Sequence, residues 1–510
     1  MARNIRFGPC SKARSLADTD AAQIAIKNDQ SACPADWNRI LICHLPCPVK
    51  SDWPYTIVLL FRNITMRSSS NPLSRILGII DEPQQFTRFV FFVLSIALFV
   101  RFAVLALNWP NWIWNGGTPS DQWDALAINL IDHGVFGFSP DVSTVIRGPI
   151  FPLVEIPLYL IFGRNYAGWS VSLLLLDTFT CFLLIVTTRR LAGNRTALLA
   201  GLYYAVNLPI IFYTAKISQV TSMLPLVVIW LYLFSLWEES YTSAWVPWVL
   251  GLVSGLTILN KTVFLPVPFI CTAVLLWLRR AEIRRIRQLV PAMIYLIVTI
   301  GVVAPWTFRN YVVTNGKFIP VQGYFWELFV QDVLYYDLDA MDHDARSDGE
   351  LLDYFKSREK EILIAHGASP DRPTNLTGPQ WEIMCENAFR DACLKWIKED
   401  PVKILKIKVA NIWHFWLRAE NWSKTRTLVL MQVVYLGAAT TGLFFLWRFR
   451  QLYRVKYALV LVLVLWAEHC PVFAWGRFSL DLVPALGLVF GLGVDAWVKQ
   501  ANLKPLTSKG

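Results

Sequence analysis

Apolar residues occur along the chain in runs of about twenty, a length that lets a helix cross roughly 30 Å of hydrocarbon. The runs predict ten membrane spans, at about 89–108, 166–188, 196–211, 214–237, 245–260, 263–278, 289–306, 427–447, 457–473 and 479–497. We therefore expect an all-α polytopic membrane protein. Segment 149–163 is also apolar, but it is too short to span comfortably and contains Glu155 and three prolines. We expect it to lie along the membrane interface.

Basic loops set the expected orientation. If the N-terminus is cytoplasmic and 149–163 does not cross, the Arg- and Lys-rich loops at 189–195, 279–287 and 448–456 all face the cytoplasm. The other face then receives loop 109–165 and a soluble insertion for which we expect mixed structure. We divide the chain into a poorly ordered cytoplasmic extension (1–85), an N-terminal membrane module (86–306), an extracytoplasmic domain (307–426) and C-terminal membrane helices with a short cytoplasmic tail (427–510).

Composition supports this class. The 510 residues are 55% hydrophobic and 17% charged, which excludes a string of soluble domains. The net charge of +11 lies largely in short loops, where it reports topology, so we expect no nucleic-acid partner. The nine cysteines do not suggest a disulfide framework, and the role of the four in the first fifty residues stays open. Met66 offers a second start, so it is also open whether residues 1–65 belong to the mature protein.

Ionisable groups gather at the predicted outer ends of the spans. Because a charge at membrane depth is costly unless it is paired or hydrated, each is a candidate functional group: Arg147, Lys261, Arg309, His469 and Arg477, beside Asp121 and Asp124 of the outer loop. Each has a plainer interpretation alone, since cations near span ends extend to the headgroups and aspartates cover solvated helix faces. Residues 121–132 predict an amphipathic helix with Asp121 and Asp124 on its polar side. Arg101 and Asp177 lie deeper and could pair with each other, and the acidic run 332–348 only vaguely resembles a calcium loop.

Over roughly residues 85–500 the sequence resembles the polytopic GT-C glycosyltransferases of the protein O-mannosyltransferase and lipid A aminoarabinose transferase type, the glycosyltransferase family 39 group. The resemblance rests on Asp121 and its amphipathic helix, the Arg147-Gly148-Pro149 turn, the segment 305–311 (PWTFRNY), and His469 with Arg477-Phe478. The sequence departs from the family pattern at Gly148, Gln219, Asn260-Lys261-Thr262, Phe478 and Asp481. These departures put the identity of the substrate in doubt.

The resemblance implies transfer of a sugar from a polyprenyl-phosphate carrier to an acceptor on the non-cytoplasmic face. Such a reaction needs a carboxylate that accepts the acceptor's proton and cations that stabilise the departing phosphate. We expect Asp121 as the base with Asp124 second, and Lys261, Arg309 and Arg477 at the phosphate. Arg147 would either join them or hold the first-loop helix, and the other candidates are His469, Gln219 and Asp481.

The expected partners are the sugar-carrying lipid, membrane lipids and an acceptor that is a lipid, a glycan or a protein. We expect no cofactor and no metal site, although a requirement for a divalent metal stays open. The expected location is a bacterial inner (plasma) membrane. Two alternatives remain, a transporter or lipid flippase and an inactive scaffold related to the transferases. Transporters place charges near the bilayer midplane, whereas here they gather at one surface.

The predicted topology can be tested by cysteine accessibility. A cysteine replacing Ser347 should react with a membrane-impermeant reagent from the outer side. One replacing Gln288 should react only from the cytoplasmic side, because one predicted span, 289–306, separates the two positions. Labelling of both positions from one side would contradict this topology.

Overall fold

The computed structural model describes residues 82–112, 122–241, 243–281, 286–339, 348–419 and 422–503. Almost all of the predicted N-terminal extension lies outside these residues, and so does Asp121. Within the described ranges the chain forms helices and loops, with a single isolated β-bridge between Ser139 and Val142 and no strand. The expected all-α fold is confirmed.

Six helices among the described residues are long and apolar enough to cross a membrane. They are α3 (Pro83–Trp112), α6 (Tyr166–Ala192), α9 (Val220–Glu239), α12 (Val290–Val313), α17 (Trp422–Arg448) and α19 (Val483–Leu503). A seventh crossing results if α7 (Asn194–Ala205) and α8 (Leu208–Ala215), bent by 53°, form one broken span. The break follows from Asn207, whose side chain accepts a hydrogen bond from the Ile210 N–H and so starts a new helix.

The other three predicted spans are shorter helices. They are α10 (Val246–Asn260), α11 (Pro266–Leu278) with the 3-10 turn η2 (Thr262–Phe264) before it, and α18 (Lys456–His469). With 15, 13 and 14 residues, they rise only about 20 Å each, which is less than the hydrocarbon thickness. The count of ten spans therefore stays a prediction. Segment 149–163 forms the short helix α5 (Ile150–Phe162).

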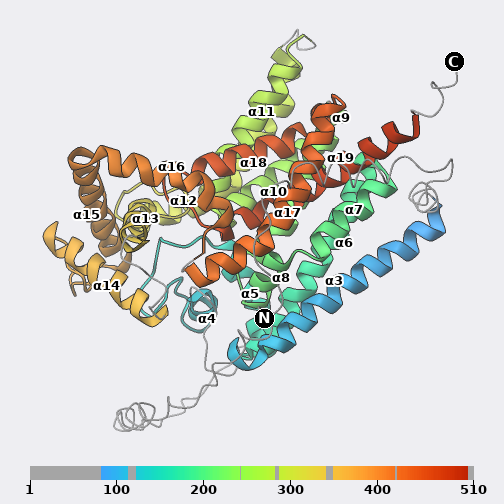
Figure 1. Ribbon diagram of the computed structural model, residues 1–510. Coiled ribbons are helices and arrows are strands. Elements are labelled where there is room, and N and C mark those ends of the chain that lie inside the picture. Colours follow the sequence, from blue (N-terminus) through green and yellow to red (C-terminus); the bar gives the residue numbers. More distant parts are fainter. Residues whose placement is uncertain are drawn as a thin grey trace, which may run out of the picture. The chain divides into compact units, whose positions relative to one another are not determined.

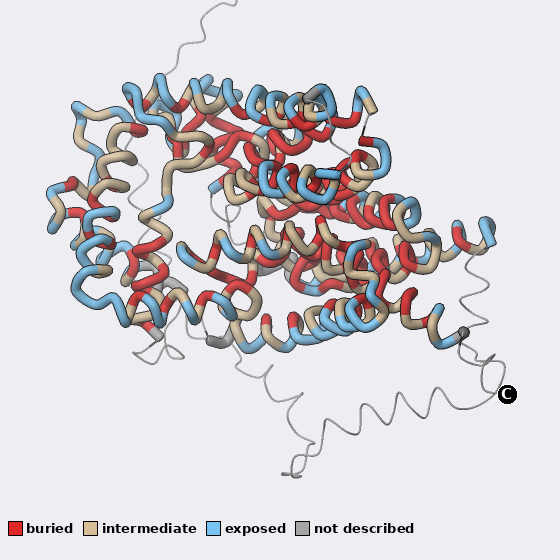
Figure 2. Tube along the Cα trace, turned by 90° about the horizontal axis from the view of Figure 1, so that it is seen from above, coloured by how far each residue is buried: buried red, intermediate tan, exposed pale blue. Residues whose placement is uncertain are grey.

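Helices far apart in sequence pack through two apolar clusters. One joins α9, α10, α12, α18 and α19, and the other joins α3, α6, α7 and α19. Gly251 and Gly255 let α10 approach α12 closely, since a Cβ on Gly251 would meet the Tyr295 carbonyl oxygen at 2.8 Å and one on Gly255 would meet the Val302 Cβ at 2.5 Å. Figure 2 shows the buried residues on the inner sides of the helices and the exposed ones on the outer turns.

The insertion contributes α13 (Phe325–Asp339), α14 (Asp348–Ala365), α15 (Gly378–Glu399) and α16 (Pro401–Leu417), which are grouped together at one side of the membrane helices (Figure 1). Its described residues are helical, so the expectation of mixed structure is replaced by helices and loops. The four helices share a core that includes Phe329, Phe355, Phe389 and Ile407. Asp400 divides α15 from α16 because its side chain accepts from the Lys403 N–H and caps the second helix.

Asp332, the first residue of the acidic run, has a structural partner. Its carboxylate lies 2.7 Å from the Lys408 Nζ and accepts a hydrogen bond from the Asn411 Nδ2 at 2.8 Å. The aspartate therefore ties α13 to α16. In the part of the chain that the structure describes, no group of three His, Cys, Asp or Glu side chains could hold a metal ion.

Arg101 and Asp177 form an ion pair inside the membrane module. The Arg101 Nε lies 2.6 Å from the Asp177 Oδ2, both side chains are buried, and the Arg101 Nη1 also donates to the carbonyls of Ala97 and Ala205 at 3.0 Å. The Tyr204 hydroxyl donates to the second carboxylate oxygen. The sequence left open whether these two residues pair with each other or with neighbours; the structure pairs them with each other, and the pair joins α3, α6 and α7.

Replacing Asp177 with Asn should destabilise the fold by about 3–5 kcal/mol, because it leaves the Arg101 charge buried without a counter-ion. Thermal unfolding of the detergent-purified protein measures the loss. The control is Asp391→Asn, which removes an exposed ion pair with Arg390 and should change the unfolding temperature little. Equal effects of the two substitutions would contradict the assigned role of Arg101.

Candidate active site

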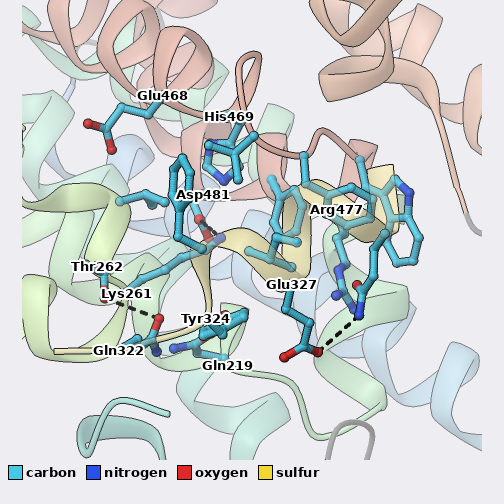
Figure 3. A pocket seen from close by; sticks show the side chains of 18 of the residues that line it. Gln219, Lys261, Thr262, Gln322, Tyr324, Glu327, Glu468, His469, Arg477 and Asp481 are labelled. Carbon is cyan, nitrogen blue, oxygen red and sulfur yellow. Dashed lines mark hydrogen bonds and ion pairs between the residues drawn. The ribbon is translucent and has the colours of Figure 1, made fainter. Parts of the chain in front are cut away.

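A cavity of about 1590 Å³ lies where the ends of the membrane helices meet the insertion. Its walls come from the turn after α10, the start of α9, the end of α18, the 3-10 helix η5 (Gly476–Leu482), α13, α14 and the loop before α5. Six candidates from the sequence line it: Arg147, Gln219, Lys261, His469, Arg477 and Asp481. Five of them appear in Figure 3 with side chains directed into this space: Gln219, Lys261, His469, Arg477 and Asp481.

Lys261 leaves the C-terminal end of α10 in an extended conformation, with φ −143° and ψ 114°. Its Nζ lies 2.5 Å from the Asp481 Oδ2, and Asp481 is fully buried. The other oxygen, Oδ1, has no hydrogen-bond partner among the described residues. The ion pair therefore fixes a lysine charge at the cavity wall and leaves part of its counter-ion unsatisfied.

Phe478 lies between Lys261 and His469. The Lys261 Nζ is 4.9 Å from the Phe478 ring centroid, and the His469 ring stacks on the same side chain with centroids 4.7 Å apart. The His469 Nδ1 lies 2.7 Å from the Leu465 carbonyl oxygen, which can only accept, so Nδ1 carries the proton. In the neutral ring this leaves Nε2 as an acceptor.

Arg147 is held between two aromatic rings. Its guanidinium carbon lies 5.1 Å from the Trp123 ring centroid and 5.3 Å from that of Tyr324, and its Nε is buried without a hydrogen-bond partner among the described residues. The next residue, Gly148, presses against α10, where a Cβ would meet the Leu259 carbonyl oxygen at 2.3 Å. Close packing therefore requires a glycine at position 148, where the sequence departs from the family pattern. The same contact brings Arg147 to the cavity.

Arg309 does not line the cavity. Its Nη1 donates to the Thr144 carbonyl oxygen at 2.6 Å and to the Asn310 Oδ1 at 3.1 Å. Glu382 of α15 holds the same segment, accepting from the Thr144 hydroxyl at 2.5 Å and from the Val145 N–H at 2.8 Å. Arg309 and Glu382 together position the backbone that leads to Arg147.

Asp124 lies on α4 (Trp123–His133), which forms where the amphipathic helix was expected, but the expectation that Asp124 lies on its solvated side is wrong. Asp124 is buried and accepts a hydrogen bond from the Tyr166 hydroxyl at 2.5 Å, because α4 packs against α5 and α6. Glu155 of α5 is fully buried, and neither of its carboxyl oxygens has a hydrogen-bond partner among the described residues. Asp124 does not line the cavity, although its neighbour Trp123 does.

Polar residues of the insertion that were not singled out from the sequence also line the cavity, among them Glu327, Gln331 and Glu359. The Gln331 Nε2 donates to one oxygen of each glutamate, at 3.2 Å in both cases. Glu327 and Gln331 could have been identified from the sequence by their spacing, because they lie four residues apart on one helix face. Glu359 comes from α14 and could be added only by the tertiary fold.

The fold and this cavity define a polytopic helical membrane protein with cations gathered at one end of its helix bundle. No family model and no curated protein matches the sequence. Several solved structures are similar in fold, at low identity.

One is the oligosaccharyltransferase AglB from Archaeoglobus fulgidus in complex with an inhibitory peptide and a dolichol-phosphate. It has 14% identity and a TM-score of 0.48, and the match covers 81% of this chain and 50% of that one. This chain thus spans about half the length of AglB. Another is ArnT from Cupriavidus metallidurans bound to undecaprenyl phosphate, with 15% identity, a TM-score of 0.36 and coverage of 81% and 78%. Both are GT-C enzymes, the group that the sequence resembles.

Glu382 should give stability a distinct pH dependence. Burial raises its pKa from 4.5 to about 7, although the accepted hydrogen bonds and the Arg309 charge oppose the rise. The folded state therefore binds a proton more tightly than the unfolded state. The contribution of Glu382 to stability is fully present below about pH 4.5 and is lost, by at most about 3 kcal/mol, as pH rises through 7. Glu382→Gln should weaken this dependence, measured as unfolding temperature at pH 5 and pH 8.

The matched control is Glu399→Gln, on an exposed part of the same helix, which should keep the wild-type pH dependence. An unchanged pH dependence of the unfolding temperature in Glu382→Gln would show that the Glu382 carboxyl group, which is bonded to Thr144, does not titrate in this range.

Proposed function

We propose that this protein is a membrane glycosyltransferase that moves a sugar from a polyprenyl-phosphate carrier to an acceptor on the non-cytoplasmic face. The observation that carries the proposal is a single cavity lined both by cationic side chains and by apolar side chains that can contact a lipid. Arg147, Lys261 and Arg477 supply positive charge. Phe269 of α11 and Leu463 of α18 also line it and are exposed on the outer surface of the bundle. A phosphate on an isoprenoid chain needs both surfaces together.

In the proposed reaction, an acceptor oxygen attacks the anomeric carbon of the carrier-bound sugar. The bond from that carbon to the phosphate oxygen breaks, its electron pair stays on the phosphate, and the acceptor's proton moves to a carboxylate. Lys261 stabilises the growing phosphate charge while Asp481 keeps its ammonium group at the wall. Arg147 and Arg477 are the further phosphate ligands, and Arg309 acts on Arg147 through the Thr144 backbone.

Asp121 is the proposed base. It stands two residues before Trp123, which lines the cavity, whereas Asp124 is turned into the packing between α4 and α6. Asp124 remains the second candidate. His469 and Gln219 have supporting roles in the proposal. Gln219 donates a hydrogen bond to the carbonyl of Asn260 and so fixes the turn that carries Lys261. No cofactor is part of the proposal, and the proposed location is a bacterial plasma membrane.

The test is a reconstituted transfer assay with a panel of polyprenyl-phosphate sugars, combined with direct binding of undecaprenyl phosphate. Lys261→Gln should lower carrier binding and reduce turnover roughly 10²- to 10³-fold, because a preorganised cation at the phosphate is lost. Asp121→Asn should reduce turnover on the order of 10²- to 10⁴-fold with carrier binding unchanged.

Lys216→Gln is the matched control. Lys216 also stands at the predicted outer end of a helix, but it lies over the Phe212 ring and does not line the cavity. It should leave both readouts unchanged. Carrier binding without transfer of any sugar would favour the flippase or the inactive scaffold, and a Lys261→Gln protein with normal binding and turnover would contradict the assignment.

A further inference from the structure

The part of the cavity formed by the insertion differs in chemistry from the part near Lys261. Glu327, Gln331 and Glu359 form a polar wall in which the Gln331 amide bridges the two carboxyl groups. We call this set the carboxylate wall. In Figure 3, Glu327 and Arg477 lie on one side of the cavity and Lys261 and Thr262 on the other. The two sets of groups therefore present separate surfaces to whatever occupies the space.

Aromatic rings adjoin the carboxylate wall. Tyr335 contacts Phe355 and Trp475, with ring centroids 4.2 Å and 5.0 Å apart, and all three residues line the cavity. Trp475 is only 8% exposed, and its Nε1–H has no hydrogen-bond partner among the described residues. The Nε1 atom is itself inaccessible, so Trp475 contributes aromatic surface to the wall rather than a hydrogen-bond donor.

The size of the cavity leaves room for two ligands. Sites for one small molecule usually measure about 300–1,000 Å³, whereas this cavity measures about 1590 Å³. A sugar phosphate at Lys261 would leave the carboxylate wall uncovered. The second occupant must therefore suit carboxyl, amide and aromatic groups.

Carbohydrate hydroxyls fit this wall better than a peptide does. Carboxyl and amide groups can both accept from and donate to hydroxyls, and burial raises the pKa of Glu359 to about 7, so at neutral pH it is present in both forms. Aromatic faces cover the apolar faces of sugar rings. A peptide bound as an added strand would need a strand edge, and the wall is built from α13 and α14, in a described part of the chain that has no strand. Lys356 and Arg147 nearby disfavour a cationic ligand.

We propose that the carboxylate wall binds the acceptor and that the acceptor is a carbohydrate, its hydroxyls held by Glu327, Gln331 and Glu359 and its rings placed against Tyr335 and Trp475. This inference rests on the proposed function, because it names the acceptor of that transfer. A glycan hydroxyl held here faces Lys261 across the cavity, while Arg477 lies beside the wall.

The experiment measures binding to the purified full-length protein by equilibrium dialysis, with tritiated maltotriose, mannotriose and triacetylchitotriose as probes and undecaprenyl phosphate bound separately. At least one trisaccharide should bind the wild type. Glu359→Gln, which replaces a charged acceptor by a weaker amide, and Trp475→Phe, which removes part of the aromatic surface, should each weaken that binding roughly tenfold or more. Glu361→Gln, an exposed glutamate paired with Arg358 on the same helix, should not.

The outcomes separate the two proposals. Unchanged undecaprenyl phosphate binding in Glu359→Gln and Trp475→Phe, with weakened trisaccharide binding, supports a distinct acceptor wall. Failure of every trisaccharide to bind, or binding that the two variants leave intact, overturns the inference. So does a Ser/Thr peptide whose binding is lost in Glu359→Gln while trisaccharides do not bind. A wild-type protein that binds a trisaccharide but no undecaprenyl phosphate overturns the proposed function and leaves the carbohydrate site standing.

Discussion

The C-terminal end of α10 is the point on which the cavity depends. A helix end leaves carbonyl groups without intrahelical partners, and here they are satisfied or covered by other parts of the chain. The Asn260 carbonyl accepts a hydrogen bond from the Gln219 side chain, and the Asn260 amide donates one to the Ser222 hydroxyl. Gln219 and Ser222 both stand at the start of α9. Gly148 packs directly on the Leu259 carbonyl. The next residue, Lys261, must therefore leave the helix in the one direction still open, toward the cavity.

Two buried ion pairs in this protein have different consequences. Arg101 donates to two backbone carbonyls and Asp177 accepts from Tyr204, so this pair joins three helices. Lys261 and Asp481 make one short contact, and one carboxylate oxygen stays unsatisfied. Only the Lys261–Asp481 pair lines the cavity, so of these two pairs it alone presents a cation to a ligand there.

The sequence allowed prediction of the helices, the class of protein and six of the residues that line the cavity. Hydrophobic periodicity is local, and cations at span ends stand out against apolar runs, so Lys261 and Arg477 could be identified without a structure. Arg309 and Asp124 could not be placed, because their partners are remote: the Thr144 carbonyl and the Tyr166 hydroxyl are set by tertiary packing. Glu359 was missed for the same reason.

The insertion holds both loops that carry cations to the cavity. On one side, Glu382 of α15 accepts hydrogen bonds from the Thr144 hydroxyl and the Val145 N–H, just before Arg147. On the other, the Asn411 amide donates to the Cys470 carbonyl at 2.9 Å and the Lys408 Nζ donates to the Val472 carbonyl at 3.0 Å, in the loop that leads to Arg477.

Asp332 accepts hydrogen bonds from Lys408 and Asn411, the two α16 side chains that bind the second loop. Helices α13 and α16 therefore form one unit there. The glutamates of α13 and α14 line the cavity from the same domain. One folded unit thus sets the positions of two cationic loops and of the wall facing them. In the proposed function, that arrangement would set the distance between the carrier phosphate and the acceptor, which is the geometric condition for transfer between them.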